Sequence, residues 1–416
     1  MLDGKRIVLG VCGGIAAYKV ADLASKLVQA GALVDVVMTA SAQRFVAPLT
    51  FQALTRRPVH TDIFAGWLDE HTGHVALARS ADLMVVAPAT AHTIARMALG
   101  LSDDMLCAVY LSLSTRAPVL VAPAMESGMY LHPATQQHIE TLRRRGATVM
   151  EPGEGHLASG AVGVGRLPEV PEIMAAIRRE LGKGGPLAGR RVVVTAGGTQ
   201  EPLDPVRYIG NRSSGKMGYA IAEEACYAGA EVTLISGPTA LPAPYGVRVV
   251  RVSTARDMLA AVLDAVKEAD ALVMAAAVAD YAPAQVAEHK IKKADEGQAL
   301  TITLTRNPDI LGELARMDLP HLVRVGFAAE TQDLLENARL KLEQKKLDMI
   351  VANEAVSSIG ADDSQLILIG RDGSVEHLPR MPKQDSARLI VGRLARLLED
   401  RGRTTTTGAG GAAPQP

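Results

Sequence analysis

The two halves of this chain repeat one pattern of strand, glycine turn and helix, and this repeat limits the folds available to it. In the first half an apolar run over residues 4–11 is followed by Gly13-Gly14. Helical periodicity continues over residues 15–30, and Gly-Ala then opens a second apolar run over residues 31–38. The pattern predicts a strand, a helix and a second strand parallel to the first.

The second half repeats the pattern at residues 189–195, Gly197-Gly198, 217–228 and 229–236. Each half also contains a buried run that begins with Ala-Asp, at residues 81–87 and at residues 269–274. Alternating strand and helix signals are typical of a parallel sheet with helices on both faces. We therefore predict an α/β protein with two doubly wound, Rossmann-like parallel-sheet domains.

Short apolar stretches near residues 300–304, 365–369 and 375–378 read as antiparallel strands, so the second domain should carry a small antiparallel appendage. Glycines and a proline between the halves indicate a linker, and a Thr-, Gly-, Ala- and Pro-rich end indicates a disordered tail. The predicted first domain, linker, second domain and tail span residues 1–181, 182–188, 189–400 and 401–416.

Composition excludes several classes of function. The chain has 416 residues and a formal net charge of −1, which gives no electrostatic case for nucleic acid or a membrane surface. No apolar run approaches the roughly 20 residues needed to span a bilayer. Its 3 cysteines are far apart and fit neither a disulfide framework nor a metal site. With no signal-like N-terminus, we expect a cytoplasmic protein.

The segment 207–218 carries the clearest binding motif. Gly210, four residues, Gly215 and Lys216 nearly match the phosphate-binding loop of nucleotide hydrolases. That loop continues with a hydroxyl residue that binds magnesium, whereas this chain has Met217. The motif therefore favours a nucleotide phosphate site and argues against an ordinary ATPase of that class.

The turn after the first strand suggests a second phosphate site. Gly13, Gly14 and Ile15 open a helix, whose backbone N–H groups suit an anion. A plain strand–helix turn would look the same. A dinucleotide is disfavoured, because the glycine fingerprint is incomplete and Thr39 ends the second strand where an acid would bind a ribose. A hydroxyl at position 39 suits a mononucleotide such as FMN.

Further candidates in the first half follow its strands or begin a helix. Each alone is more often structural, and a metal at His71 and His74 lacks a third ligand at suitable spacing. The candidates are His74, Pro88, Ala89, Thr90, Met125 and Glu126.

Together these residues resemble the flavin-dependent cysteine decarboxylases, in particular the phosphopantothenoylcysteine decarboxylases, over residues 1 to about 180. The resemblance implies FMN as cofactor, bound by residues 13–15, 39 and 88–90, and His74 as the catalytic histidine. It implies substrate contacts at Met125 and Glu126. Two positions depart from the family: Glu126 replaces a common asparagine, and Ser159 replaces a cysteine that donates a proton.

The second half resembles the phosphopantothenate–cysteine ligases from about residue 189 to residue 400. The matching segments are residues 197–207, 211–218, 275–281, 290–293, 307–310, 326–331, Lys341 and Lys345. The resemblance implies CTP and an acyl-cytidylate intermediate, with Asn211 and Lys290 catalytic. Implied substrate contacts are Ala275, Ala276, Ala277, Asp280, Asn307, Pro308, Asp309, Ile310, Phe327, Lys341 and Lys345.

The chemistry of the second half is consistent on physical grounds. Activating a carboxylate with a nucleoside triphosphate requires positive charge near the phosphates and Mg²⁺, whose protein ligands the sequence leaves open. Lys341 and Lys345 lie four residues apart on one face of a predicted helix. Taken alone, that pair would more often be a solvated surface.

The resemblance predicts a bifunctional enzyme of coenzyme A synthesis that uses 4'-phosphopantothenate, cysteine and CTP. It also implies a homo-oligomer with trimeric flavin domains and dimeric ligase domains. One alternative is a live ligase joined to a flavin-binding domain whose decarboxylase is impaired, because of Glu126 and Ser159. A second alternative, an NAD(P)-dependent oxidoreductase, is disfavoured by the missing acid and glycine fingerprint.

Overall fold

The structure, a computed structural model, describes residues 2–64, 73–113, 117–292, 300–330, 332–354 and 360–407. It divides into two compact units, Met1–Gly182 and Lys183–Pro416, and each is described by itself. His71, Lys293, Thr331 and residues 408–416 lie outside the described residues.

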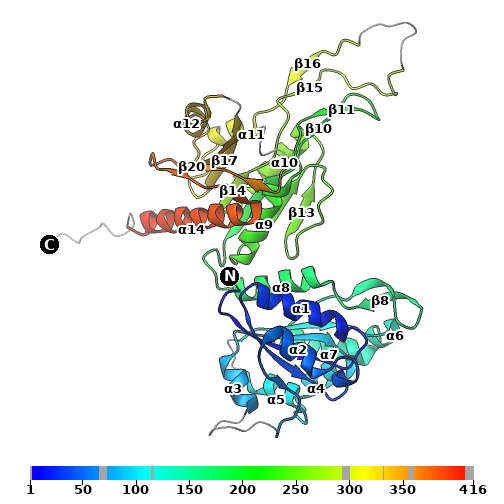
Figure 1. The fold of residues 1–416 in the computed structure, drawn as a ribbon. Helices are drawn as coiled ribbons and strands as arrows, with labels where there is room; N and C mark the ends of the chain where they lie inside the picture. The colour runs from blue at the N-terminus through cyan, green and yellow to red at the C-terminus, as the bar shows by residue number, and fades with distance from the viewer. Residues whose placement is uncertain are drawn as a thin grey trace, which may run out of the picture. The chain divides into compact units, whose positions relative to one another are not determined.

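The first unit is built on a parallel six-stranded sheet of order β3-β2-β1-β4-β5-β6 (Figure 1). Its strands are β1 Arg6–Val11, β2 Leu33–Met38, β3 Val59–His60, β4 Leu83–Ala89, β5 Val119–Pro123 and β6 Thr148–Val149. Its helices are α1 Ala17–Gln29, α2 Pro48–Thr55, α3 Gly73–Ser80, α4 Ala91–Leu99, α5 Met105–Ser112, α6 Ser127–Tyr130, α7 Pro133–Arg144 and α8 Val170–Gly182. An antiparallel hairpin, β7 Gly153–His156 and β8 Val162–Arg166, precedes α8.

The second unit contains an eight-stranded sheet of order β13-β12-β9-β14-β17-β18-β20-β21. Its strands are β9 Arg191–Ala196, β12 Glu231–Ser236, β13 Arg248–Arg251, β14 Ala271–Met274, β17 Val323–Glu330, β18 Met349–Glu354, β20 Ile367–Gly370 and β21 Val375–His377. The first six strands in this order run parallel to one another. Strand β20 pairs antiparallel with both of its neighbours, β18 and β21. The two sheets confirm the predicted α/β class and its antiparallel addition.

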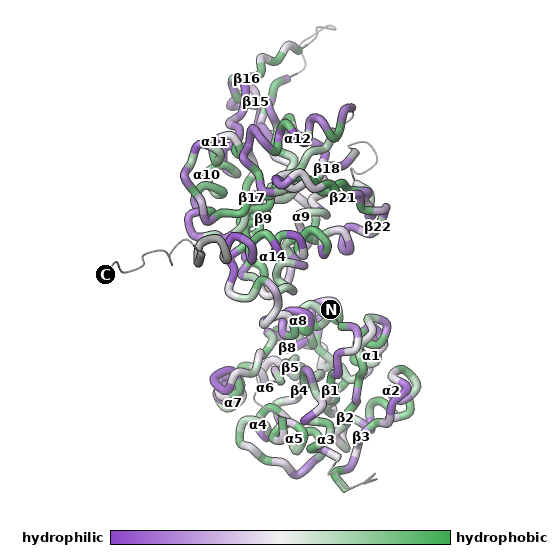
Figure 2. The backbone as a smooth tube through the Cα atoms, turned by 90° about the vertical axis from the view of Figure 1, so that its left-hand side faces the viewer, coloured by the Kyte–Doolittle hydropathy of each residue, from purple (hydrophilic) through white to green (hydrophobic). Residues whose placement is uncertain are grey.

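Helices cover both faces of the second sheet. They are α9 Lys216–Tyr227, α10 Ala255–Ala265, α11 Ile310–Arg316, α12 Leu334–Gln344 and α14 Lys383–Thr407. Helices α9 and α14 share one core, while α10, α11 and α12 share the other. Both cores are lined by the apolar central strands, which appear green in the hydropathy view (Figure 2).

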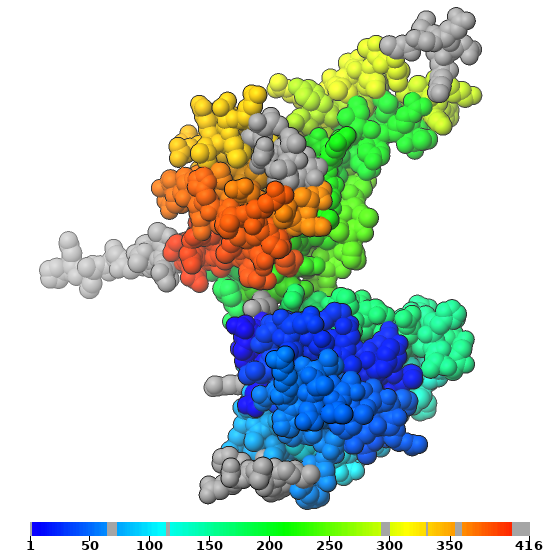
Figure 3. Space-filling view, in the orientation of Figure 1, coloured from blue at the N-terminus to red at the C-terminus, as the bar shows by residue number. Residues whose placement is uncertain are grey.

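The second unit also contains three small antiparallel pairs of strands. They are β10 Gln200–Pro202 with β11 Tyr208–Gly210, β15 Tyr281–Pro283 with β16 Leu304–Arg306, and β19 Asp363–Ser364 with β22 Met381–Pro382. The first two pairs project from the body of this unit (Figures 1 and 3). The strand predicted over residues 300–304 therefore begins only at Leu304, where pairing with β15 supplies its partner.

The repeated Gly-Ala has a structural cause. Gly31 follows α1 with φ 89°, and Gly229 follows α9 with φ 99°, a backbone region that favours glycine. Each glycine thus ends a helix before a strand that lies parallel to the first.

Two predicted boundaries change with the structure. Leu187, within the predicted linker, is buried in the core of the second unit and donates its N–H to the Ala228 carbonyl. Helix α14 continues past Arg401 to Thr407, into the segment predicted as a disordered tail. Composition alone reveals neither the burial of Leu187 nor the continuation of α14.

Candidate active sites

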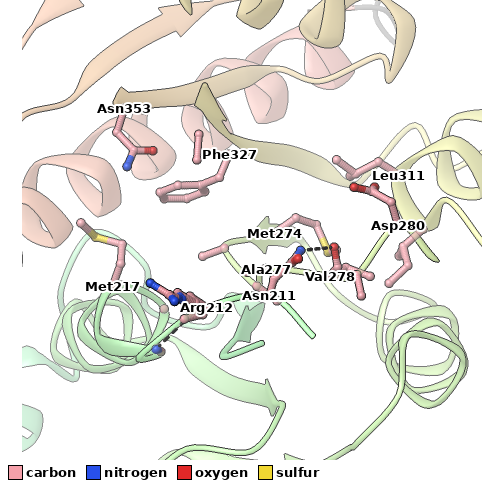
Figure 4. Close-up of a pocket in the computed structure, with 18 of the residues that line it drawn as sticks. Asn211, Arg212, Met217, Met274, Ala277, Val278, Asp280, Leu311, Phe327 and Asn353 are labelled. Atoms are coloured by element: carbon pink, nitrogen blue, oxygen red, sulfur yellow. Dashed lines mark hydrogen bonds between the residues drawn. The ribbon is translucent and has the colours of Figure 1, made fainter. Parts of the chain in front are cut away.

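The second unit contains a cavity of about 1140 Å³ at the carboxyl ends of its central strands. The order of the sheet reverses between β9 and β14, so the loops after these strands diverge and leave a crevice, as doubly wound sheets do. Figure 4 shows Phe327 in the middle of the cavity, Met217 and Asn353 on one side, and Asp280 and Leu311 on the other.

Asn211 and the residues that follow it, up to Gly218, form one wall of this cavity. Asn211 Nδ2 donates to the Val278 carbonyl at 2.9 Å. A Cβ atom added to Gly198 would lie 2.5 Å from the Asn211 carbonyl oxygen, so the backbones meet closely only because residue 198 is glycine. Gly215 has φ 76° and caps the N-terminus of α9. The predicted phosphate turn therefore lies against the strand ends.

The alanines after β14 are held by the loop after β9. Ala277 N donates to the Gly197 carbonyl at 2.8 Å, and Ala276 N donates to Thr195 Oγ1 at 3.1 Å. These bonds fix the backbone of Ala275, Ala276 and Ala277 in the cavity wall. Asp280 follows with an exposed side chain that also lines the cavity.

The segment Asn307, Pro308, Asp309 and Ile310 forms the opposite wall. Asn307 Nδ2 donates to the Ala279 carbonyl at 2.9 Å, and Asp309 caps α11 by accepting from Gly312 N. Burial acts to raise the pKa of Asp309, but the hydrogen bonds from Lys345 and from Gly312 N hold that pKa below its usual value.

The predicted lysines have different positions. Lys341 lines the cavity and donates to the carbonyl of Phe327 at 2.8 Å, so both predicted residues meet there. Lys345 is not among the lining residues, but it pairs with Asp309, which is. Lys290 is exposed on the loop after β15 and is not among the lining residues, so the structure does not bring it to the cavity. Its loop is held instead by Arg207 Nη2, which donates to the Ile291 carbonyl at 2.7 Å.

Sequence reasoning did not select several residues that line the cavity: Arg212, Asn353, Ser364 and Lys383. Asn353 had a usable signal, because it is a polar residue near the end of the apolar strand β18. Lys383 had none, because its position depends on how α14 packs against α9.

The order of the first sheet also reverses, between β1 and β4, which is where doubly wound sheets bind their ligands. A Cβ atom added to Gly13 would lie 2.2 Å from the Ser41 side chain, which only glycine avoids. A Cβ atom added to Gly14 would lie 3.7 Å from Thr90 Cγ2, so the two turns are neighbours. Ile15, beside them, is exposed.

The hydroxyls predicted to bind FMN already have partners. Thr39 is buried, and its Oγ1 accepts from Ala42 N at 3.2 Å. Thr90 Oγ1 caps α4 by accepting from Thr93 N. Pro88 and Ala89 are buried within β4. These hydroxyls are therefore engaged within the fold, at the strand ends beside the glycine turn.

His74 lies at the start of α3, and its Nδ1 is buried without a hydrogen-bond partner among the described residues. A buried nitrogen in this state costs free energy unless another group satisfies it. The orphaned nitrogen and the glycine cradle are the two observations that fit a bound flavin mononucleotide in this unit.

Glu126 and Ser159, the two departures from the family pattern, contact each other. Ser159 Oγ donates to Glu126 Oε2 at 2.8 Å. The β7–β8 hairpin is held beside β5, because Met125 N donates to the Gly165 carbonyl at 2.9 Å and Ser127 Oγ donates to the Val164 carbonyl at 2.6 Å. The hairpin thus brings position 159 to position 126.

Within the described residues, no group of three potential protein ligands for a metal comes together. In the same part of the chain, no helix is both long enough and apolar enough to cross a bilayer.

Comparisons with known proteins divide the chain in the same way. Residues 1–182 match the Flavoprotein family, and residues 187–398 match the C-terminal domain of the DNA/pantothenate metabolism flavoproteins. The chain therefore joins a flavoprotein domain to a second Rossmann-like domain of pantothenate metabolism.

Several relatives that match over most of their length are named coenzyme A biosynthesis bifunctional protein CoaBC. That of Bacillus subtilis is 46% identical over 97% of this chain and 99% of its own length. That of Mycobacterium bovis is 48% identical over 96% and 99%. A crystal structure of a CoaBC C-terminal domain is 42% identical, covers 52% of this chain and 99% of its own, and gives a TM-score of 0.46. This chain belongs to the CoaBC family of coenzyme A biosynthesis proteins.

Proposed function

We propose that the second unit joins 4'-phosphopantothenate to cysteine with CTP, through an acyl-cytidylate. The observation that carries the proposal is the cavity at the switch of the second sheet. It is lined by Gly215 of the predicted phosphate turn, by the amide of Asn211 and by the ammonium group of Lys341. These are the groups that a nucleotide-activated carboxylate requires.

Within this cavity, Phe327 and the segment from Asn307 to Ile310 would frame the cytosine. Asn211 would position the carboxylate of phosphopantothenate. Its amide donates to the Val278 carbonyl, next to Ala275–Ala277 in the cavity wall. Mg²⁺ would arrive with the triphosphate, and Asp280 offers an exposed carboxylate of the kind that such a partly hydrated ion binds. Lys290 would have to reach the phosphates by movement of its loop or from another copy of the chain.

The first unit would decarboxylate phosphopantothenoylcysteine to 4'-phosphopantetheine. FMN, when bound, would supply two-electron chemistry at the cysteinyl group of the substrate. The backbone N–H groups of the turn at Gly13 and Gly14 would bind the FMN phosphate, and His74 would hold or move a proton near the thiol. Met125 would pack against the substrate, and the Glu126–Ser159 pair would provide the proton that the product carbon takes up.

The alternative with an impaired decarboxylase draws no support from the relatives. That alternative was suggested because the family's asparagine and cysteine are missing from this chain. In the structure, the residues that replace them, Glu126 and Ser159, are joined by a hydrogen bond. Because a carboxylic acid can donate a proton, the pair is a workable substitute and we retain two activities in the proposal.

By the same resemblance, the chain would assemble as a homo-oligomer in the cytoplasm, from trimeric flavin domains and dimeric ligase domains. Its exposed apolar side chains on the β10–β11 and β15–β16 arms, among them Tyr208 and Tyr281, suit burial between copies.

The test uses the full chain with FMN, phosphopantothenate, cysteine, CTP and Mg²⁺, and follows CMP, carbon dioxide and phosphopantetheine. We expect all three products in equal amounts. CMP without carbon dioxide would favour the impaired decarboxylase, and absence of CMP would reject the ligase. Asn211→Asp should lower product release by about 100-fold, as expected for a group that stabilises the transition state.

A further inference from the structure

A buried threonine lies behind the wall of the cavity in the second unit. Thr199 follows the glycine turn after β9 and is 0% exposed. Its Oγ1 accepts a hydrogen bond from Ala279 N at 2.9 Å. Ala279 lines the cavity, whereas Thr199 is not among the lining residues. Thr199 therefore acts on the wall from behind, without contact with a bound substrate.

The loop that contains Thr199 is paired with this wall along its backbone. Gly198 and Ala277 form a parallel β-bridge. Ala277 N donates to the Gly197 carbonyl at 2.8 Å, and Thr199 N donates to the Ala277 carbonyl at 3.3 Å. The hydroxyl of Thr199 extends this pairing to the N–H of Ala279. The wall is thus held in place as far as the peptide that precedes Ala279.

That same peptide anchors Asn211, the amide predicted to be catalytic. Asn211 Nδ2 donates to the Val278 carbonyl at 2.9 Å (Figure 4). The Val278 carbonyl and the Ala279 N–H belong to one peptide group, which is planar and trans, so fixing the direction of one fixes the direction of the other. Thr199 binds the N–H and Asn211 binds the carbonyl. The hydroxyl of Thr199 therefore determines which way the acceptor of Asn211 points.

We propose that Thr199 is a positioning residue for the ligation. Its hydroxyl holds the peptide between Val278 and Ala279, and this peptide holds the amide of Asn211 in the orientation that the reaction requires. A peptide turned the other way would present its N–H to Asn211, and the amide would have to turn with it. The inference rests on the proposed ligase function, in which Asn211 positions the carboxylate of phosphopantothenate.

The wall beyond this peptide has a separate support. Asn307 Nδ2 donates to the Ala279 carbonyl at 2.9 Å, and Asn307 N donates to the Asp280 carbonyl at 2.8 Å. These two bonds do not involve Thr199. Loss of the Thr199 hydroxyl should therefore disturb Asn211 more than the segment from Asn307 onward, which would frame the cytosine.

Steady-state kinetics of CMP release by the full chain tests the proposal. Thr199→Val keeps nearly the same shape but leaves the N–H of Ala279, a residue only 4% exposed, without its acceptor. We expect kcat to fall by about 10-fold, the effect of one buried group left unpaired. KM for CTP should stay within about twofold, because the bonds of Asn307 remain. Thr199→Ser retains the hydroxyl and should keep kcat within about twofold of wild type.

A double-mutant cycle with Asn211→Ala separates positioning from general stability. If Thr199 acts through Asn211, Thr199→Val should lower the rate of Asn211→Ala by less than about twofold. Thr55→Val is the matched control in the first unit. It removes another buried hydroxyl that accepts from a backbone N–H, that of Arg57 at 3.3 Å, and should leave CMP release unchanged.

Three results would overturn the assignment: full kcat in Thr199→Val, an equal loss in Thr199→Val and Thr199→Ser, or a tenfold loss that persists in the Asn211→Ala background. Should Thr199→Val fail to fold in thermal unfolding, Thr199→Ser and Thr199→Ala make the same comparison, because they differ by the hydroxyl alone. Absence of CMP release by wild type would instead reject the ligase function itself.

Discussion

Glu126 shows how one residue can change the role of its neighbour. Its carboxylate accepts a hydrogen bond from Ser159, whose hydroxyl alone is a weak acid. We predict that Glu126→Gln keeps carbon dioxide release but lowers phosphopantetheine yield by about 100-fold, because the amide cannot donate an acidic proton. Glu154→Gln, in the same hairpin, is the control. Faster turnover in Glu126→Gln would show that the carboxylate only repels the substrate.

Burial should make two cysteines of the first unit unreactive. Burial is the main cause that raises the pKa of Cys12 from 9.0 to about 11 and that of Cys107 from 9.0 to about 12. Their thiols therefore stay protonated at pH 8, and native protein should show no fast alkylation at either position by mass spectrometry. The raised pKa values stabilise the fold fully below pH 9, and this contribution is lost as pH rises through 11 and 12. Rapid labelling of native Cys12 at pH 8 would contradict the burial argument.

Helix α9 packs in close contact with β9, and the stability of the helix should depend on that contact. A Cβ atom added to Gly218 would lie 2.6 Å from Ala196 Cβ and 2.7 Å from the Thr195 carbonyl oxygen. Gly218→Ala should therefore lower the free energy of unfolding by about 1–3 kcal/mol, since backbone must move. Gly392→Ala in α14, where nothing lies within 4 Å, should raise it by roughly 0.5–1 kcal/mol. Denaturant titration measures both, and equal effects would refute the packing argument.

At the scale of the whole molecule, each unit has its own cores and its own sheet. We predict that a fragment from Lys183 onward folds alone and forms phosphopantothenoylcysteine with CTP and Mg²⁺. The fragment must include Leu187, which is buried in that core. A fragment that starts at Arg190 should lose roughly 2 kcal/mol of stability from the missing leucine. A folded fragment that makes no product would show that the ligase needs the first unit.

Much of the architecture was predictable because strand and helix periods are local properties of the sequence. The apolar runs, the glycine turns and the two Gly-Ala steps predicted both sheets, and the family resemblance singled out Asn211 and Phe327, which line the cavity. The strand predicted over residues 300–304 was displaced to β16, which begins only where β15 offers a partner.

The sequence by itself determined the α/β class and the two-part plan, because both follow from patterns within short segments. Its resemblance to a known family supplied several of the residues that line the second cavity. Tertiary structure alone decided which distant side chains meet. Packing of α14 on α9 brings Lys383 beside Lys216, and a hairpin brings Ser159 onto Glu126. The family motif assigned Lys290 to the catalytic site, but Lys290 is not among the residues that line the cavity. Such pairings depend on helix packing and backbone hydrogen bonds between remote segments, which no local period encodes.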